Sequence, residues 1–279
     1  MRENELPPRR RPSTVVGVID SAGLLAAYDS QLRTDAETAG AVSVTRQGPL
    51  LLATLGSGRG FITYRDLEGA EADAIGRMVG QALAYYQANP EITKVEWKTR
   101  GHDHAPGLHQ ALLEHGFIPD EPESIMVGDA AALAVDVTLP DGVSLRRVTA
   151  EPDIRAMAAM QDEVFGNRHG EEMADSLLRR LARGDQLELW VAEANAAIVS
   201  AGRIESVDGT DFAGIWGGAT RPEWRGRGIY RALTAERARS ALRLGKKYIN
   251  SDSTEFSRPI LERSGLVKVS TTTPYNWTR

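Results

Sequence analysis

The stretch GGATRPEWRGRGIYRALTAERARSALRLGKKYIN, residues 217–250, joins a short apolar segment to a long helical pattern through a basic glycine turn. At the turn, residues 225–230 read Arg-Gly-Arg-Gly-Ile-Tyr. Glycine lets a backbone approach an anion closely, and the unpaired N–H groups at the start of a helix attract negative charge. The arginines would add charge-assisted hydrogen bonds. The turn therefore predicts a cradle for a phosphate.

Two familiar phosphate-binding motifs do not fit this turn. The P-loop pattern G-x-x-x-x-G-K-[ST] is absent, and the dinucleotide pattern G-x-G-x-x-G would need a glycine where Arg231 stands. Residues 225–230 do match R-x-x-G-x-[G/A] up to its last position. That pattern is the acyl-CoA pyrophosphate loop of the GNAT acetyltransferases, which the segment ATRPEWRGRGIYRAL, residues 219–233, resembles.

The resemblance extends over residues 143–279. The segment SRPILERSGL, residues 257–266, is similar to the short helix and glycine with which the family closes its site. The resemblance implies acetyl-CoA as the acyl donor, with its pyrophosphate on the loop amides and its pantetheine arm paired with the end of the preceding strand. Thr254 and Ser257 either contact the pantetheine or cap the following helix. The implied cofactor-binding residues are Gly218, Ala219, Thr220, Arg225, Gly226, Arg227, Gly228, Ile229, Tyr230, Thr254 and Ser257.

Two positions depart from the family pattern. Tyr230 stands where the family prefers glycine or alanine, and Leu261 stands where many members have the tyrosine that protonates the leaving thiolate. Because leucine cannot donate a proton, an active enzyme would need another group or a water for that step.

Direct transfer, as the resemblance implies, also needs a base that takes a proton from the attacking ammonium. Carboxylates on or beside the central strands are candidates, although each could equally be a solvent-facing charge. No catalytic residue is assigned from the sequence. Likewise, the basic residues of the helix after the turn (Arg231, Arg237, Arg239 and Arg243) are interpreted as a solvated face. The candidate carboxylates are Glu188, Glu193, Glu205 and Asp211.

The two halves of the chain share one order of elements, which predicts a tandem duplication of a mixed α/β (α+β) unit. Each unit is expected to be a mostly antiparallel central sheet flanked by helices. We expect a flexible tail over residues 1–13, a degenerate GNAT-like domain over 14–128, a linker over 129–142 and the acyl-CoA-binding domain over 143–279. Tandem acetyltransferases of bacteria, such as mycothiol synthase, are similar to this arrangement.

The first half lacks the phosphate loop. Its long helical pattern, residues 71–88, follows FITYRDLEGAEADAIG, which contains no R-x-x-G-x-G. The glycine-rich LGSGRGF, residues 55–61, is interpreted as a loop between strands. A histidine-rich segment, residues 102–115, could share a metal, but without cysteines or an i,i+4 histidine pair it favours solvated residues, and no metal is expected.

Composition excludes several classes of function. The chain has 279 residues, a formal net charge of −5 and no cysteine, which argues against nucleic-acid binding and excludes disulfides and thiolate chemistry. It contains neither a signal-like apolar segment nor a membrane span, so we expect a cytoplasmic protein. The leading hypothesis is an N-acetyltransferase acting on a small-molecule or peptide amine. The alternative is a catalytically inactive acyl-CoA-binding or sensing module, and a homo-oligomer is left open.

Overall fold

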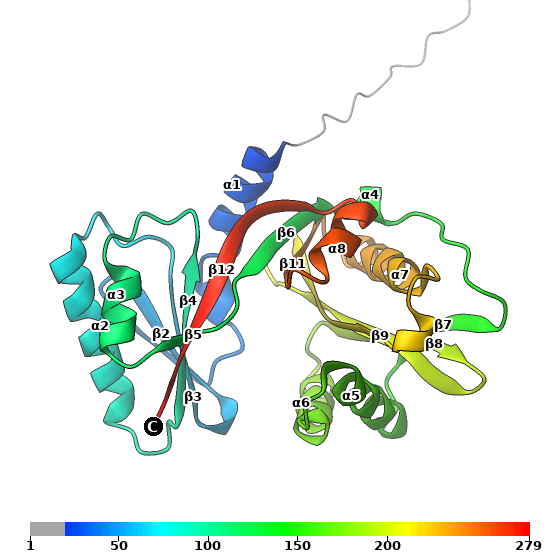
Figure 1. Cartoon of the computed structure of the whole chain (residues 1–279), viewed down its shortest axis with the longest axis horizontal. Helices are drawn as coiled ribbons and strands as arrows, with labels where there is room; N and C mark the ends of the chain where they lie inside the picture. Colours follow the sequence, from blue (N-terminus) through cyan, green and yellow to red (C-terminus); the bar gives the residue numbers. More distant parts are fainter. Residues whose placement is uncertain (1–19) are drawn as a thin grey trace, which may run out of the picture.

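The computed structural model describes residues 20–279, so the tail expected over residues 1–13 lies outside the described residues. Within them the strands form one sheet in the order β1-β2-β3-β4-β12-β6-β11-β10-β9-β8-β7, with β5 paired to β12 (Figure 1). The strands are β1 (Ser43–Gln47), β2 (Leu50–Leu55), β3 (Arg59–Tyr64), β4 (Lys94–Arg100), β5 (Ile118–Pro119), β6 (Glu123–Asp129), β7 (Val143–Val148), β8 (Leu187–Ala194), β9 (Ala197–Ser206), β10 (Phe212–Thr220), β11 (Tyr248–Ser253) and β12 (Val267–Thr278).

Helices cover the faces of this sheet. They are α1 (Ser21–Gln31), α2 (Ala72–Gln87), α3 (Leu108–Glu114), α4 (Ala130–Leu133), α5 (Glu151–Phe165), α6 (Gly170–Ala182), α7 (Ile229–Arg243) and α8 (Arg258–Ser264), with short 3-10 turns η1 (Asp35–Thr38), η2 (Gly56–Gly58) and η3 (Pro222–Trp224). Among the strands of residues 20–279, only two pairs are parallel, β3 with β4 and β10 with β11. The predicted mixed fold, mostly antiparallel and in tandem form, is confirmed.

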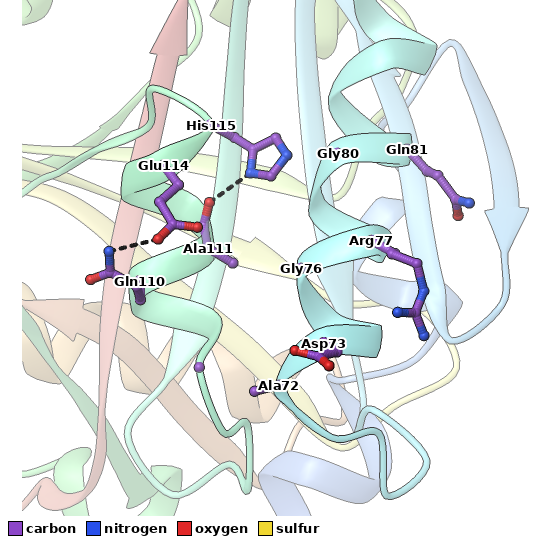
Figure 2. A pocket seen from close by; sticks show the side chains of 11 residues that line it. Ala72, Asp73, Gly76, Arg77, Gly80, Gln81, Gln110, Ala111, Glu114 and His115 are labelled. Atoms are coloured by element: carbon purple, nitrogen blue, oxygen red, sulfur yellow. Dashed lines mark hydrogen bonds between the residues drawn. The ribbon is translucent and has the colours of Figure 1, made fainter.

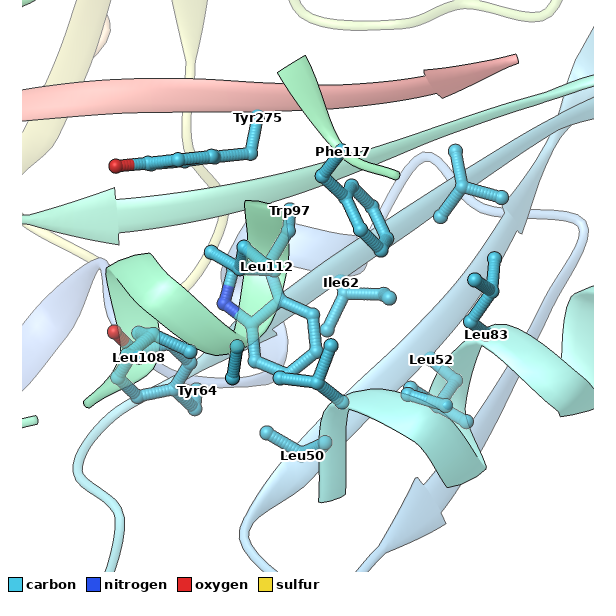
Figure 3. Close-up of a cluster of buried hydrophobic side chains, with 14 of the residues drawn as sticks. Leu50, Leu52, Ile62, Tyr64, Leu83, Trp97, Leu108, Leu112, Phe117 and Tyr275 are labelled. Atoms are coloured by element: carbon cyan, nitrogen blue, oxygen red, sulfur yellow. The ribbon is translucent and has the colours of Figure 1, made fainter. Parts of the chain in front are cut away.

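In the first half, α2 and α3 cover one face of β2, β3 and β4. The helical spacing of Ile75, Val79 and Leu83 turns one apolar stripe of α2 toward the sheet, where Trp97 lies fully buried (Figure 3). Tyr275 packs into the same cluster although it belongs to β12, near the end of the chain. The core of the first half is therefore completed by the second.

In the second half the two faces of the sheet are covered differently. Helices α5 and α6 pack on one face, through a cluster that includes Met157, Leu177 and Leu189. Helix α7 packs on the other face, where Ala238 and Ala241 join a cluster with Ile215 of β10 and Leu261 of α8. The glycine turn before α7 thus lies at one end of β10, between a packed strand and a packed helix.

The last strands of the two halves are exchanged. β6 ends the first half but pairs with β11 of the second, and β12 ends the chain but lies between β4 and β6. β6 thus joins the strands of the second half, and β12 joins those of the first. One hydrogen-bonded sheet therefore runs through the described residues of both halves (Figure 1).

Two local differences from the sequence-based expectations have physical reasons. The expected linker contains the one-turn helix α4, because Asp129 caps it by accepting hydrogen bonds from the Ala131 and Ala132 amides. The final strand, which lies in the predicted domain 143–279, pairs with β4 of the first half and for that reason continues to Thr278. The glycine-rich segment after β2 forms η2 and leads into β3, which confirms that it connects two strands.

Candidate functional site

Strands β10 and β11 diverge beside the glycine turn. They pair in parallel only from Phe212 opposite Tyr248 to Gly214 opposite Asn250. Beyond that point β10 continues along β9, with a bulge between Trp216 and Ala219. A bulge re-aims successive residues of a strand, and here Ala219 packs into the α5–α6 cluster while a side chain at position 218 would point at α7. The divergence leaves one edge of β10 without a strand partner in the described chain.

The turn at residues 225–230 places free donors at the start of α7. Gly226 and Gly228 have φ values of +73° and +80°, a region that residues with side chains rarely adopt, and Gly228 is the N-cap of the helix. Within residues 20–279, no protein atom accepts a hydrogen bond from the amides of residues 226–231, and the first helical bond there runs from Ala232 to the Gly228 carbonyl. These amides are free to bind an anion.

Three arginines surround these amides. Arg225 donates from Nε to the Thr220 carbonyl at 3.0 Å, Arg227 lies over the Trp224 ring at 5.0 Å, and Arg231 is exposed on the first turn of α7. None of the three forms an ion pair with a described carboxylate, and the first turn of α7 contains no acidic residue. The geometry fits a phosphate group, whose charge the arginines and the helix dipole would both stabilise.

The end of β10 is polar on its backbone and firmly held. Its carbonyls already accept side-chain hydrogen bonds, that of Gly217 from Gln161 Nε2 at 2.5 Å and that of Ala219 from Ser200 Oγ at 2.7 Å. Thr220 Oγ1 is also within 2.7 Å of Ser200 Oγ. A carbonyl oxygen can accept a second hydrogen bond, so this edge can still receive an extended chain.

Tyr230, the first departure from the family pattern, lies against β10. A Cβ added to Gly218 would come within 2.6 Å of both Cε2 and the hydroxyl of Tyr230, so only glycine leaves room for the ring. Behind the ring lies Arg237, whose Cζ is 5.7 Å from the ring centroid and whose residue is only 1% exposed. The expectation that Arg237 belongs to a solvated face is therefore wrong, because Gly202 of β9 opens room for its guanidinium beneath the helix.

Leu261, the second departure, is 1% exposed and packs in the cluster between α7, α8 and the sheet. Tyr230 packs against the same cluster. The leucine fills the core there, and the phenol that packs against this cluster and beside Gly218 of β10 comes from α7.

The four carboxylates considered as bases are all engaged. Glu193 accepts hydrogen bonds from Arg146, and these bonds lower the pKa of Glu193. Asp211 accepts a hydrogen bond from Gln31. Burial would raise the pKa of Glu188 and of Glu205, but hydrogen bonds from Ser240 and Trp190 to Glu188, and the contacts of two arginines with Glu205, outweigh it and lower both values. The arginines of Glu205 are Arg180 at 2.8 Å and Arg203 at 2.6 Å.

Thr254 and Ser257 form a turn that leads into α8. The Ser257 amide lies 3.4 Å from Thr254 Oγ1, and the two hydroxyls are 3.2 Å apart. Ser257 is the N-cap residue, but its side chain makes no capping bond. Both residues follow β11 on the chain, while the turn at 225–230 follows β10, so the structure places the predicted site residues at the ends of two neighbouring strands.

An ion pair between the halves was not predicted from the sequence. Lys98 of β4 donates to Asp252 of β11 at 2.6 Å, and the Asp252 side chain is 10% exposed. No sequence signal indicates this pair, because Lys98 and Asp252 meet only through the exchange of the final strands.

The first half has a different surface at the corresponding helix. Figure 2 shows a pocket between α2 and α3, lined by Asp73 and Arg77 of α2 and by Gln110, Glu114 and His115 from α3 and its end. The first turn of α2 carries Asp73 and follows Glu71, and no glycine turn with arginines precedes it. A pyrophosphate at this end of α2 would meet negative charge.

His102, His109 and His115 of the first half have protein partners. His102 contacts Asp29 and Ser270, and His109 Nδ1 lies 2.6 Å from the Tyr275 hydroxyl. Among residues 20–279, no group of three or more histidine, aspartate or glutamate side chains is placed to hold a metal ion. In the same range, no helix has the length and apolar character needed to cross a membrane.

Comparisons with known proteins agree with this geometry. Residues 139–250 match the Acetyltransferase (GNAT) domain family. No curated protein matches the sequence significantly.

Among solved structures, the chain is similar to a functionally unknown conserved protein from Staphylococcus epidermidis (16% identity, TM-score 0.66, 88% of this chain and 98% of that one). It is also similar to a GCN5-related N-acetyltransferase from Kribbella flavida, with 14% identity and a TM-score of 0.66 over 87% of this chain and 93% of that one. A third similar structure is a tandem GNAT protein from the clavulanic acid biosynthesis pathway, with 18% identity and a TM-score of 0.59 over 84% of this chain and 81% of that one. The chain therefore contains a GNAT acetyltransferase domain in its second half and has the fold of the tandem GNAT proteins.

Proposed function

We propose that the second half binds acetyl-CoA and transfers its acetyl group to an amine by direct attack. The observation that carries the proposal is the set of unbonded amides at residues 226–231, surrounded by three arginines without carboxylate partners. This cradle suits the pyrophosphate of acetyl-CoA. The pantetheine would extend along the free edge of β10 near Gly218, Ala219 and Thr220, in the manner of an added strand.

In this arrangement the protein contributes position and electrostatics. The thioester would lie where β10 and β11 diverge, and the amine would approach it from the face opposite α7, where Lys98 and Asp252 join the two halves. Holding both reactants in one place replaces an encounter in solution by a reaction within the complex. A main-chain amide of β10 would polarise the carbonyl oxygen.

The alternative function, an inactive acyl-CoA-binding module, also has a specific observation in its favour. Leu261 is buried and cannot donate a proton, and each of the four carboxylates first considered as bases already has a partner. Such a module would bind acetyl-CoA without turnover. We expect release of CoA from acetyl-CoA in the presence of a broad panel of primary amines, a result that an inactive module would not give.

A calorimetric titration of acetyl-CoA tests the cradle. We expect Gly228→Glu to abolish binding, because it adds a carboxylate where the phosphates would lie. Gly245→Glu is the matched control: Gly245 follows the other end of α7 and also has a positive φ, +73°, with no atom within 4 Å of an added Cβ. Both variants carry the same backbone strain, so equal binding by the two would refute the cradle.

A further inference from the structure

Arg237 is a buried cation without a counter-ion. Its residue is 1% exposed, and among the ion pairs of residues 20–279 it takes part in none. Within residues 20–279 the guanidinium donates to the Leu233 carbonyl and to Thr234 Oγ1, both on its own helix. Burial without a carboxylate lowers its pKa. A buried charge is costly unless something nearby compensates it, so a group that gains negative charge close to Arg237 would be stabilised.

The side chain between Arg237 and the diverging strands is Tyr230. Its ring lies 5.7 Å from Arg237 Cζ, and its hydroxyl is 2.6 Å from the position that a Cβ on Gly218 would take. Three glycines make this arrangement possible: Gly202 admits the guanidinium, Gly218 admits the phenol, and Gly228 begins the helix that carries both. The hydroxyl is thereby held beside Gly218, on the side of β10 that faces α7, close to the segment along which acyl-CoA is proposed to lie.

We propose that Tyr230 is a catalytic residue whose hydroxyl donates a hydrogen bond to the leaving sulfur of acyl-CoA, and that Arg237 is a positioning residue that polarises this hydroxyl. The inference rests on the proposed function, because it places the thioester beside Gly218. It also accounts for both departures from the family pattern at once: the leucine at 261 removes a hydroxyl from α8, and the tyrosine at 230 supplies one from α7.

The chemical step balances with these groups alone. The amine nitrogen attacks the carbonyl carbon, a C–N bond forms, the C–S bond breaks and its electron pair goes to sulfur. The Tyr230 O–H donates a hydrogen bond to the thiolate so formed, and the nearby Arg237 cation strengthens that donor. The ammonium formed by the attack loses its proton to solvent, and CoA leaves as the thiolate or takes a proton from solvent.

The test uses CoA itself as the probe, so it does not depend on knowing the acceptor. A phenol and a cation beside the sulfur favour the thiolate, so the thiol of bound CoA should ionise at a pH about 1 to 3 units below the value of about 8.5 for a free thiol. Thiolate absorbance in the ultraviolet, followed against pH in the CoA complex of the full chain, measures this shift directly.

Two variants and one control make the result specific. We expect Tyr230→Phe, which keeps the ring over Gly218, to bind CoA within about threefold of the wild type but to return the thiol to its ordinary titration. We expect Arg237→Met to do the same while its melting temperature is unchanged or raised, since an apolar chain of similar length replaces an unpaired buried charge. Arg239→Met, on the same helix but bonded to Asp136 and Glu236, should change nothing in the titration.

Each outcome decides between the proposals. If CoA binds but its thiol titrates alike in the wild type and in Tyr230→Phe, the inference fails and the proposed function stands. If the wild type does not bind CoA, the proposed function fails and the inference fails with it. If Arg237→Met does not fold, Tyr230→Phe decides alone. A double variant should show no larger change than Tyr230→Phe, because Arg237 acts through that hydroxyl.

Discussion

The helices α2 and α7 occupy equivalent places in the two halves, yet their N-termini carry opposite charge. α7 begins after two glycines with positive φ and is surrounded by Arg225, Arg227 and Arg231. α2 begins at Ala72 after Glu71, and Asp73 stands in its first turn. α2 connects β3 to the parallel strand β4, and α7 connects β10 to the parallel strand β11. The comparison teaches that the repeated fold supplies the helix start twice, while side-chain charge and glycine placement leave free amides beside arginines at only one of the two described helix starts.

The largest expected effect comes from separating the halves. Deleting residues 267–279 removes β12 from between β4 and β6, and also removes Tyr275 from the core of the first half. We expect the truncated chain to lose cooperative unfolding altogether, because the edges it exposes belong to both halves. Circular dichroism during denaturant unfolding measures this. A truncated chain in which the first half still unfolded cooperatively would show that the halves fold independently.

An intermediate effect is expected when the start of α7 is given the charge of α2. The double change Arg227→Glu and Arg231→Glu should weaken acetyl-CoA binding roughly 100-fold or more, because each hydrogen bond to a charged group contributes about 1.5–3 kcal/mol. Both residues are exposed, so stability should change little. Calorimetric titration measures the loss.

The reciprocal change, Asp73→Arg in the first half, is the control for that experiment. Because no glycine turn precedes α2, we expect it to leave the stoichiometry at one acetyl-CoA per chain. A second binding event would mean that charge alone, without the glycine-lined amides, is enough to make the site.

The smallest effect concerns buried carboxylates, which differ in the two halves. Burial raises the pKa of Glu96 in the first half, whereas in the second half the contacts of Arg180 and Arg203 outweigh burial and lower the pKa of Glu205. A raised pKa gives stability that is present at low pH and lost as pH rises through the folded value; a lowered pKa gives stability that is lost as pH falls through it.

At neutral pH, Glu96→Gln should therefore raise the melting temperature and Glu205→Gln should lower it, each by a few degrees at most. Melting curves from about pH 4 to pH 8 measure both, and the Glu205→Gln variant should lose part of the destabilisation at acid pH. Shifts of the same sign in the two variants would contradict the comparison.

Much of the fold could be predicted from the sequence because it depends on local patterns. The apolar spacing of Ile75, Val79 and Leu83 gave a long helix over residues 71–88, and the structure has it over Ala72–Gln87. The glycine turn at 225–230 gave a helix start with free amides, since glycine alone readily adopts the φ values found at Gly226 and Gly228. These features need only neighbouring residues, so the chain itself contains the information.

Tertiary structure alone decided the features that join distant segments. The exchange of β6 and β12 depends on which of several similar strand edges pair, and strand periodicity does not distinguish them. Arg237 looked like a surface residue of a basic helix, but Gly202 and Gly218 of two other strands bring its guanidinium and the Tyr230 ring under the helix. The sequence by itself determined a tandem GNAT fold and a glycine-rich helix start with free amides; packing between strands and helices far apart in the chain determined that Tyr230 lies against β10 with Arg237 buried behind it.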